Sequence, residues 1–468
     1  MVCLTLALQV IDVILFLDKH HRLVMGGIMG KCYLNTIGIA LLWVIMLSQV
    51  SAAPAANVKS AVNRAETSTK VKENLVLPYL FSTDTMGVNL GVGGMLSGYY
   101  QEQMTIGGTV FGGEVSRGIG GGVWNYKLPK TERFFLSVYG MLGYYPQQKA
   151  YAGSTDEYIP QDIPLPGSNG SSNEQFLQAD GSSNWFDIKL EYALPWGATE
   201  DSGRVAYQIE NGLLVSAPSG GREWNPLKSG ATVLVLRQFN RYQSFEFEED
   251  TLDGAIHALE LGILYDNTDF PINPSYGSSQ YLSISHDAAW LESDNEWTFI
   301  NLDVSKYFSL GSSDYASQRI IALNFWTGYS PSWALEYDAL GGRRVTGNAP
   351  YNEGATLGGF YRMRGFDQSR FHDKAVIYGT AEYRYTFKEN PVEDINWLRF
   401  LRLDWFQLVG FVEAGRVAPS FKASELFNDI KYDYGVSLRA MMAGLVVRSD
   451  IAHSEEGTNL WIMVDHPF

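Results

Sequence analysis

The chain has almost no cysteine and no excess of basic residues. Its 468 residues include two cysteines, Cys3 and Cys32, both close to the N-terminus. If that region is removed, the remaining chain has no thiol, which fits an oxidising compartment entered without a disulfide framework. Lys and Arg number 35 against 51 Asp and Glu, which gives a net charge of −16. This balance argues against a nucleic-acid-binding protein, because no basic surface is available to neutralise phosphates.

Long apolar runs are confined to the first residues of the chain. Lys31 precedes an apolar run over residues 37–47, and the small residues Ser51, Ala52 and Ala53 follow it. A positive residue, an apolar run and small residues in this order are typical of an export signal. We therefore predict a signal peptide over residues 1–52, cleaved near Ala52.

The predicted signal has an unusual beginning. A second apolar run covers residues 2–17, and translation from Met25 or Met29 would give a signal of ordinary length. A two-helix membrane anchor is the alternative interpretation. After Ala53 there is no apolar run of the ~18 residues that a membrane helix needs, so we expect no such helix in the rest of the chain.

Sequence motifs of catalysis are also missing. The histidines beyond the signal do not have the spacing of metal ligands, no G-x-S-x-G turn is present, and no phosphate-binding glycine loop precedes a helix. We therefore predict that the chain is not an enzyme and carries no cofactor and no metal. A Ser/His pair that assembles in space on a barrel wall leaves no motif, so a barrel phospholipase stays open as an alternative.

Alternation of apolar and polar residues is what the chain has in abundance. In residues 184–194, Phe186, Ile188 and Leu190 alternate with charged residues such as Asp187. Side chains alternate across a strand, so such a segment has one apolar and one charged face. A charged row is rarely a buried soluble core, whereas in a membrane barrel it lines the wet lumen and the apolar row faces lipid.

Segments of this kind recur from Leu75 to the C-terminus. The predicted strands are 87–96, 101–113, 117–126, 133–145, 184–194, 205–215, 231–242, 255–265, 280–289, 298–308, 319–329, 375–385, 403–416, 432–442, 444–452 and 459–468. An even set of about sixteen strands suits a single-chain barrel, and closure removes the edges of so large a sheet. We predict an all-β fold, a transmembrane antiparallel β-barrel over residues 75–468, preceded by a linker over residues 53–74.

Two connections are much longer than the others. With both termini in the periplasm, the strand count places residues 330–373 outside the cell and residues 147–183 in the periplasm, where turns are usually short. Residues 147–183 are therefore either a true periplasmic insertion, or one early strand is miscounted.

Four stretches give the chain a family resemblance. Met363-Arg364-Gly365-Phe366 follows a glycine-rich lead, Gly410–Gly415 reads GFVEAG, Arg448–Ala452 reads RSDIA, and the chain ends in Phe468. A weaker fifth stretch is Asp266–Gly277. In this order they resemble the bacterial surface antigen superfamily of BamA/TamA-type outer-membrane barrels. Family insertases carry POTRA domains ahead of the barrel, for which the linker leaves no room, so the chain resembles a stand-alone barrel.

The resemblance implies a site inside the barrel. It implies that the long loop folds into the lumen and that Arg364 bonds to acidic residues of the last strands, here Glu413 and Asp450. A buried guanidinium needs a carboxylate, and its planar fork suits bidentate pairing. Gly365 would permit a tight turn and Phe366 would anchor the loop tip. An exposed arginine in an outer loop is the alternative.

Other residues have two interpretations each. Glu382 and Arg384 either join this network or are solvated lumen residues, and the second is favoured. Phe468, with Leu460, Ile462 and Val464 on its face, is either a C-terminal assembly signal or a lipid-facing aromatic without a recognition role; the two are compatible.

The predicted function follows the resemblance. We expect an outer-membrane protein of a Gram-negative bacterium that takes part in outer-membrane protein or lipid assembly or translocation. The alternatives are a passive diffusion channel and a surface protein without a transport role. The expected partners are outer-membrane lipid and lipopolysaccharide, the barrel assembly machinery that inserts the chain itself, and client proteins. No nucleic acid is expected.

Overall fold

The computed structural model describes residues 63–64, 72–83, 87–113, 116–151, 158–221, 223–247, 251–291, 293, 295–350 and 353–468. The predicted signal peptide over residues 1–52 and most of the linker over residues 53–74 lie outside the described residues. Among the described residues, no helix is both long and apolar enough to cross a membrane.

Strands make up most of the described chain. They are β1 (Asn63–Arg64), β2 (Glu73–Thr83), β3 (Gly87–Ser97), β4 (Thr105–Gly113), β5 (Arg117–Lys127), β6 (Phe134–Ala150), β7 (Leu177–Ala193), β8 (Ala206–Tyr207), β9 (Ile209–Glu210), β10 (Leu213–Leu214), β11 (Ala231–Glu246), β12 (Thr251–Thr268), β13 (Gly277–Ala288), β14 (Glu296–Ser309), β15 (Ala316–Tyr329), β16 (Ala334–Tyr337), β17 (Arg343–Thr346), β18 (Thr356–Leu357), β19 (Phe371–His372), β20 (Ala375–Phe387), β21 (Leu403–Ala418), β22 (Lys431–Met442), β23 (Leu445–Ser454) and β24 (Gly457–Val464). The helices are short: η2 (Gly197–Thr199), η3 (Asn396–Leu401) and α3 (Ala423–Leu426).

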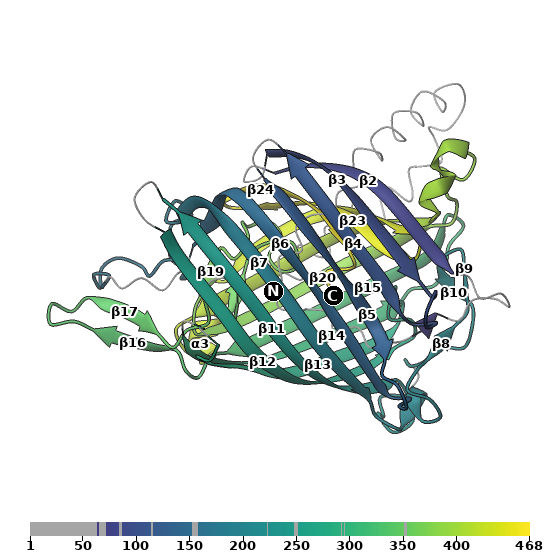
Figure 1. Cartoon of the computed structure of the whole chain (residues 1–468), viewed down its shortest axis with the longest axis horizontal. Coiled ribbons are helices and arrows are strands. Elements are labelled where there is room, and N and C mark those ends of the chain that lie inside the picture. Colours follow the sequence, from purple (N-terminus) through teal and green to yellow (C-terminus); the bar gives the residue numbers. More distant parts are fainter. Residues whose placement is uncertain are drawn as a thin grey trace.

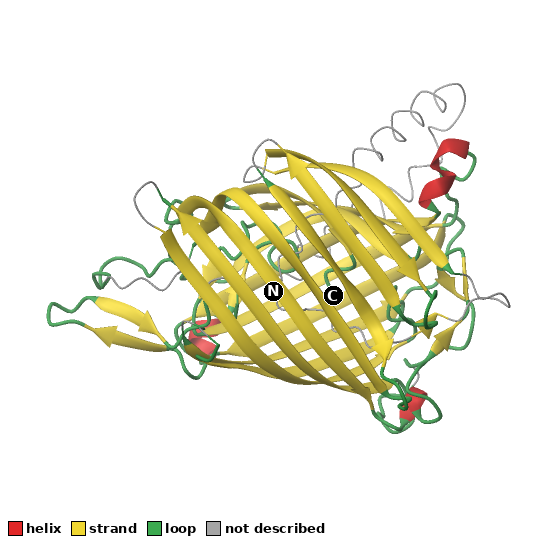
Figure 2. Cartoon of the chain, viewed as in Figure 1, coloured by secondary structure: helices red, strands yellow, loops and turns green. Residues whose placement is uncertain are grey.

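Sixteen of these strands form one antiparallel sheet. Its order is β2-β3-β4-β5-β6-β7-β11-β12-β13-β14-β15-β20-β21-β22-β23-β24, so strands that follow one another in the wall also pair with one another. Figure 1 shows the tilted strands wrapped around a common lumen, with the β16–β17 hairpin projecting beyond one end. Figure 2 shows that the short helices lie at the ends of the barrel and not in its wall. The predicted antiparallel barrel of about sixteen strands is confirmed.

The two faces of the wall have opposite chemistry. On β7, Phe186 and Ile188 are exposed while Asp187 and Glu191 are buried. On β20, Glu382 is likewise buried. A soluble protein has the reverse arrangement, with apolar side chains inside and charges outside. The exposed apolar row is the lipid-facing surface, and the buried charged row lines the lumen.

Two strand predictions were wrong, and their errors cancel in the total. Residues 205–215 do not form a wall strand, because only the short pieces β8, β9 and β10 occur there. The first wall strand is β2, which begins at Glu73 and not in residues 87–96. The shift moves residues 151–176, which join β6 to β7, to the end of the barrel that carries residues 330–374. The long early connection is therefore explained by the miscounted strand and not by an insertion at the opposite end.

The first and last wall strands are not paired. Every other pair of neighbours is joined by a ladder of paired residues, but β2 and β24 are the two ends of the described sheet and no ladder joins them. β24 spans 8 residues against 11 for β2. We call this place the seam. At the seam, one side of β2 and one side of β24 have no neighbouring strand in the described sheet. Such a sheet edge can pair with an added strand.

Candidate functional site: a loop bound inside the barrel

The loop between β15 and β20, residues 330–374, enters the lumen through a tight local structure. Gly358 and Gly359 have φ angles of 109° and 104°, which side chains with a Cβ rarely adopt. The amide of Gly359 donates to the carbonyl of Phe366 at 3.1 Å, and the amide of Phe366 donates to the carbonyl of Met363 at 3.0 Å. These bonds fold residues 358–366 into a compact tip.

Arg364 lies at this tip and contacts three carboxylates. Its Nε is 3.2 Å from Oε1 of Glu413, its Nη2 is 3.1 Å from Oε1 of Glu382, and its Nη1 is 3.4 Å from Oδ2 of Asp450. Its guanidinium carbon lies 3.5 Å from the ring centroid of Phe411. The partners come from β20, β21 and β23, so one side chain ties the loop to three strands. We call Arg364, Glu382, Glu413 and Asp450 the lumen network.

The structure thus brings Arg364 together with both acidic residues that the resemblance implies. Burial opposes the charge of Arg364, but the carboxylates of Glu413 and Glu382 raise the pKa of its guanidinium above the ordinary value. All four side chains of the network are fully buried. The exposed-arginine interpretation does not describe this geometry.

Glu382 of β20 is bonded to three arginines. Besides Arg364, it accepts from Nη2 of Arg439 at 2.7 Å and from Nε of Arg384 at 2.8 Å. Sequence reasoning favoured a solvated Glu382 and Arg384, and it was wrong because it had no view of the register that sets Arg439 nearby. Three guanidinium groups bind the Glu382 carboxylate strongly, because hydrogen bonds between charged partners are stronger than neutral ones.

Arg448 extends the network to the loop backbone. Its guanidinium pairs with Asp450, and its Nη2 donates to the carbonyl of Phe360 at 2.5 Å. Its Nε donates to the carbonyl of Asp465 at 2.9 Å. The R-x-D pattern of β23 therefore places Arg448 and Asp450 side by side on the lumen face. Arg448 binds the main chain of the loop, and Asp450 binds the side chain of Arg364.

Gly365 fits its place by its size and not by a turn conformation. Its φ is not positive; Met363 has the positive φ at this turn, 57°. A Cβ on Gly365 would lie 2.5 Å from Cβ of Asp433 and 2.9 Å from Cβ of Ser454. The Gly365 amide donates to Oδ2 of Asp433 at 3.0 Å, and its carbonyl accepts from Oγ of Ser454 at 2.6 Å. The prediction of a tight turn at Gly365 is corrected to a close approach of backbone to wall.

Asp433, Ser454 and Trp461 were not found from the sequence. Nε1 of Trp461 donates to the carbonyl of Arg364 at 2.7 Å. Asp433 pairs in register with Glu413, and both point into the lumen. Its position between Tyr432 and Tyr434, in an alternating strand, was the signal that would have identified it.

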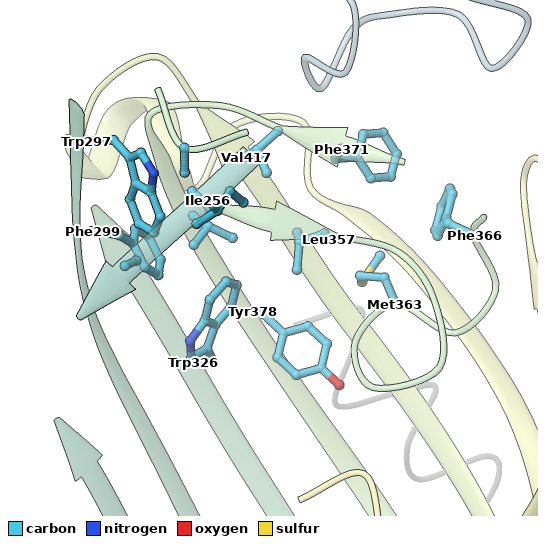
Figure 3. Close-up of a cluster of buried hydrophobic side chains, with 14 of the residues drawn as sticks. Ile256, Trp297, Phe299, Trp326, Leu357, Met363, Phe366, Phe371, Tyr378 and Val417 are labelled. Atoms are coloured by element: carbon cyan, nitrogen blue, oxygen red, sulfur yellow. The ribbon is translucent and has the colours of Figure 1, made fainter. Parts of the chain in front are cut away.

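Apolar packing holds the same loop from its other side. Figure 3 shows Met363, Phe366 and Phe371 of the loop gathered against wall residues such as Trp326 and Tyr378. The rings of Phe366 and Phe371 lie 5.1 Å apart, edge to face. Phe366 is fully buried, as expected of an anchor at the loop tip.

Further ion pairs join the loop to β14 and β11. Arg362 lies 2.8 Å from Asp303 of β14, and its guanidinium stacks 3.9 Å from the Trp326 ring centroid. Glu353 lies 3.1 Å from Arg241 of β11. The loop is therefore bonded to five wall strands, β11, β14, β20, β21 and β23.

A second loop covers the first. We call residues 158–176 the strap. Arg370 donates from Nη2 to the Ser171 carbonyl at 2.6 Å and from Nη1 to Ser171 Oγ at 2.9 Å. The amide of His372 donates to the Gly167 carbonyl at 2.7 Å. The strap and the long loop thus close the same end of the barrel together.

Burial changes the protonation of two loop residues. It raises the pKa of Glu353 to about 7, although Arg241 and Arg237 oppose the shift. It lowers the pKa of His372 to about 4. Burial therefore favours the neutral form of both side chains, the protonated carboxyl of Glu353 and the unprotonated imidazole of His372.

Phe468 does not continue the outer row of β24. The strand ends at Val464, and Asp465 has a φ of 78°, which turns the last residues inward. The Phe468 ring is buried, 6.2 Å from the Tyr307 ring and 5.0 Å from the guanidinium of Arg384. The lipid-facing interpretation is corrected, because the terminal ring lies in the lumen.

His466 binds the same wall. Its Nδ1 lies 2.7 Å from Nη1 of Arg439, the arginine that also bonds Glu382. The C-terminal residues and the long loop are therefore connected through a shared set of side chains. Within the described part of the chain, no group of three His, Cys, Asp or Glu side chains has the arrangement of a metal site.

A family match agrees with this architecture. Residues 188–456 match the Omp85 superfamily domain, which is more than half of the chain. The chain belongs to the Omp85 superfamily. The matched residues include the whole loop and the strands that carry Glu382, Glu413 and Asp450.

Similar solved structures of the Omp85 chain include a BamA and two CdiB proteins. BamA from Haemophilus ducreyi lacking POTRA domains 1–3 has 12% identity and a TM-score of 0.42, over 84% of this chain and 68% of that one. CdiB from Acinetobacter baumannii has 11% identity and a TM-score of 0.46, over 84% and 60%. CdiB from Escherichia coli has 10% identity and a TM-score of 0.49, over 86% and 62%. The Omp85 chain thus spans less than two thirds of either CdiB chain. No curated protein matches it.

Proposed function

We propose that this Omp85 barrel assembles or translocates outer-membrane proteins or lipids at its seam, in the outer membrane of a Gram-negative bacterium. Membership of the superfamily supports a general role in outer-membrane assembly or translocation. The observation that carries the finer proposal is the absence of a ladder between β2 and β24 in the described sheet. An unpaired edge inside a bilayer is a place where an incoming strand gains main-chain hydrogen bonds.

The lumen network has a holding role in this proposal. Arg364 fixes the loop to β20, β21 and β23, which are among the last five strands of the wall that ends at β24. A rigid C-terminal wall lets the edge of β24 keep one position while the opposite edge moves. Buried, charge-assisted hydrogen bonds suit such a role, because breaking one partner leaves an uncompensated charge.

The lumen contents disfavour a passive channel. The long loop is bonded to β11 through Glu353, to β14 through Arg362 and to β21 through Arg364. At the opposite end, Nε1 of Trp405 on β21 donates to the carbonyl of Gly212, in the connection between β7 and β11. Chain segments therefore occupy the lumen from both ends.

An insertion assay tests the assembly function. The purified chain is reconstituted in liposomes with an unfolded outer-membrane barrel as the client, and folding of the client is followed by its gel mobility. We expect faster folding than in liposomes alone. Cysteines at Val76 of β2 and Leu460 of β24, joined by a long flexible bismaleimide, are expected to abolish the acceleration. The same variant without the cross-linker is the matched control.

Planar-bilayer conductance separates the alternatives. Large, steady openings of the wild type would favour the diffusion channel and contradict the proposal. Equal client folding with and without the chain, together with negligible conductance, would favour a surface protein without a transport role.

A further inference from the structure

The connection between β20 and β21, residues 388–402, is a flap with two unlike sides. η3 forms its centre, and Leu398 and Leu401 on this helix are buried. Trp397 and Phe400 on the same helix are each 49% exposed. In a 3₁₀-helix, residues three apart lie above one another, so the two leucines share one side and the two aromatic residues share another. The flap is therefore amphipathic.

The buried side of the flap covers the outer face of the wall. On β22, the outward row contains Val436 and Leu438, which are exposed, and continues with Ala440 and Met442, which are only 8% and 4% exposed. Alternation along the strand puts all four on the lipid-facing side. The last two belong to the same apolar cluster as the buried flap residues Val392, Leu398 and Leu401, a cluster that also includes residues of β2. The flap thus packs on part of the lipid-facing side of β22.

The flap also reaches across the seam. The carbonyl of Arg402 accepts from the amide of Ala443, in the turn between β22 and β23, at 3.0 Å. Nη2 of the same arginine lies 3.5 Å from Oδ1 of Asn74, at the start of β2. Leu77 and Tyr79 of β2 belong to the same apolar cluster as the flap. The flap therefore contacts both end regions of the sheet, the β22–β23 turn on one side of the seam and the start of β2 on the other.

The exposed side of the flap has the composition of a membrane-interface anchor. Trp397 and Phe400 are accompanied by Arg399 and Arg402, which are also exposed. Aromatic rings with basic neighbours collect where hydrocarbon meets lipid head groups. Figure 2 shows η3 beyond the strand ends at one rim of the barrel, where such a boundary lies. The surface is continuous with the lipid-facing row of β22 that it covers.

We propose that this flap docks on the glycerophospholipid of the leaflet at the rim where β2 begins. Trp397 and Phe400 enter the boundary between head groups and acyl chains, and Arg399 and Arg402 donate to lipid phosphates. The flap then holds the end of the seam to the membrane surface. The proposal depends on the barrel spanning a membrane and not on the assembly activity, so either can fail without the other.

Lipid contact is measured with single cysteines in a chain begun after residue 52, which has no native thiol. Cysteine replaces Trp397, Phe400 or Glu393, and each is labelled with an environment-sensitive fluorophore. Glu393 is the matched control, because it is exposed on the same flap outside η3. The whole barrel is reconstituted in vesicles of phosphatidylethanolamine and phosphatidylglycerol with brominated acyl chains.

Bromine quenches only fluorophores that lie near the acyl chains. We expect most of the fluorescence to be lost at positions 397 and 400 and little at 393, with the reverse order for quenching by aqueous iodide. No bromine quenching at 397 and 400, or equal quenching at all three positions, would overturn the proposal. Iodide access at 397 and 400 in vesicles would point to a protein partner instead of lipid.

Folding of each labelled variant is checked by the mobility of the unheated form in gels. Positions 397 and 400 are tested separately, so a folding failure at one leaves the other as the test. A second measurement uses unlabelled protein: W397S/F400S in place of the wild type is expected to weaken binding of detergent-solubilised barrel to phospholipid nanodiscs. The W397F/F400W variant, which keeps two aromatic rings, is expected to bind like the wild type, and weakened binding of this variant would contradict the anchor.

Discussion

Glu413 accepts two hydrogen bonds from Arg364, one from the backbone amide at 2.6 Å and one from Nε of the guanidinium at 3.2 Å. The same carboxylate also accepts from the hydroxyl of Tyr378 at 2.5 Å. One wall side chain therefore fixes both the main chain and the side chain of the loop tip. The position of the loop depends on Arg364 more than on any residue whose backbone alone is bonded.

Replacing Arg364 by Ala is expected to destabilise the folded barrel. Removal of one partner of a buried ion pair costs ~3–5 kcal/mol, because the remaining charges are left without compensation. The measurement is the temperature at which the compact form in unheated gels converts to the unfolded form. Lys228→Ala is the control, since Lys228 pairs with Glu223 at 3.5 Å and both side chains are exposed. An exposed pair is worth about 0–1 kcal/mol, so this variant should unfold like the wild type. Equal unfolding temperatures for both variants would refute the holding role of Arg364.

Gly365→Ala is expected to weaken the loop without removing any charge. The added methyl group would lie 2.5 Å from Cβ of Asp433, so loop and wall must separate. Overpacking of this kind costs about 1–3 kcal/mol. Limited proteolysis of residues 330–374 measures the effect, and cleavage should become faster. Gly170→Ala, in the strap, is the control because a Cβ there would meet nothing within 4 Å. Unchanged cleavage of the Gly365 variant would show that the close approach has no energetic consequence.

Phe468→Ala is expected to affect the folded barrel as well as its assembly. The ring packs in a cluster with Tyr307, Ile320 and Ala322, so its removal leaves a cavity. Phe→Ala changes in a packed interior cost about 3–5 kcal/mol. Thermal unfolding of protein refolded in detergent reports on packing, since no assembly machinery is present there. Phe468→Leu fills most of the space and should restore much of the stability. A variant that folds poorly in cells but melts like the wild type in detergent would assign Phe468 to recognition alone.

The stability of the loop is expected to fall between pH 5 and pH 8 because of Glu353. Burial raises its pKa from the ordinary 4.5 to about 7, so the folded state keeps the proton more readily than the unfolded state. Its contribution is complete below the unfolded pKa and is lost as pH rises through about 7. Glu353→Gln is neutral at every pH and should lose less stability over this interval than the wild type.

His372 changes the stability of the loop with pH in the opposite direction to Glu353. Its pKa is lowered from 6.5 to about 4, so its contribution is present above 6.5 and is lost as pH falls toward 4.

Thermal unfolding of the wild type and of Glu353→Gln is measured in detergent at pH 5 and pH 8. Glu174→Gln is the control, because Glu174 is exposed in the strap. Identical pH dependence of the Glu353 variant and the wild type would contradict the assignment.

The alternation of residues predicted the wall well, but it could not assign every strand. Residues 205–215 alternate like a wall strand, yet they lie in a connection where Tyr207 packs 5.3 Å from the Phe270 ring. Alternation records that one face is buried, and a connection folded against the lumen also buries one face. β2 was missed in part because it contains Pro78, and proline lowers confidence in a strand although an edge strand tolerates it.

The site residues that belong to a sequence motif could be predicted. Those whose contacts depend on how the strands pair could not. Arg364, Glu413 and Asp450 stand in recognisable motifs. The third acidic partner, Glu382, and the contact of Gly365 with Asp433 depend on which strands meet the loop tip, and spacing along the chain does not contain that information. The inward turn at Asp465 was equally hidden, because Phe468 keeps the alternation of β24 up to the end of the sequence.

The inward position of Phe468 decides where a label can be attached. A purification tag fused behind this residue would begin inside the barrel, between Tyr307 and Arg384, and would have to displace the ring in order to leave. The tip of the β16–β17 hairpin offers free access instead, since Leu340 is 96% exposed there. Epitopes and fluorescent labels for this protein belong at that tip.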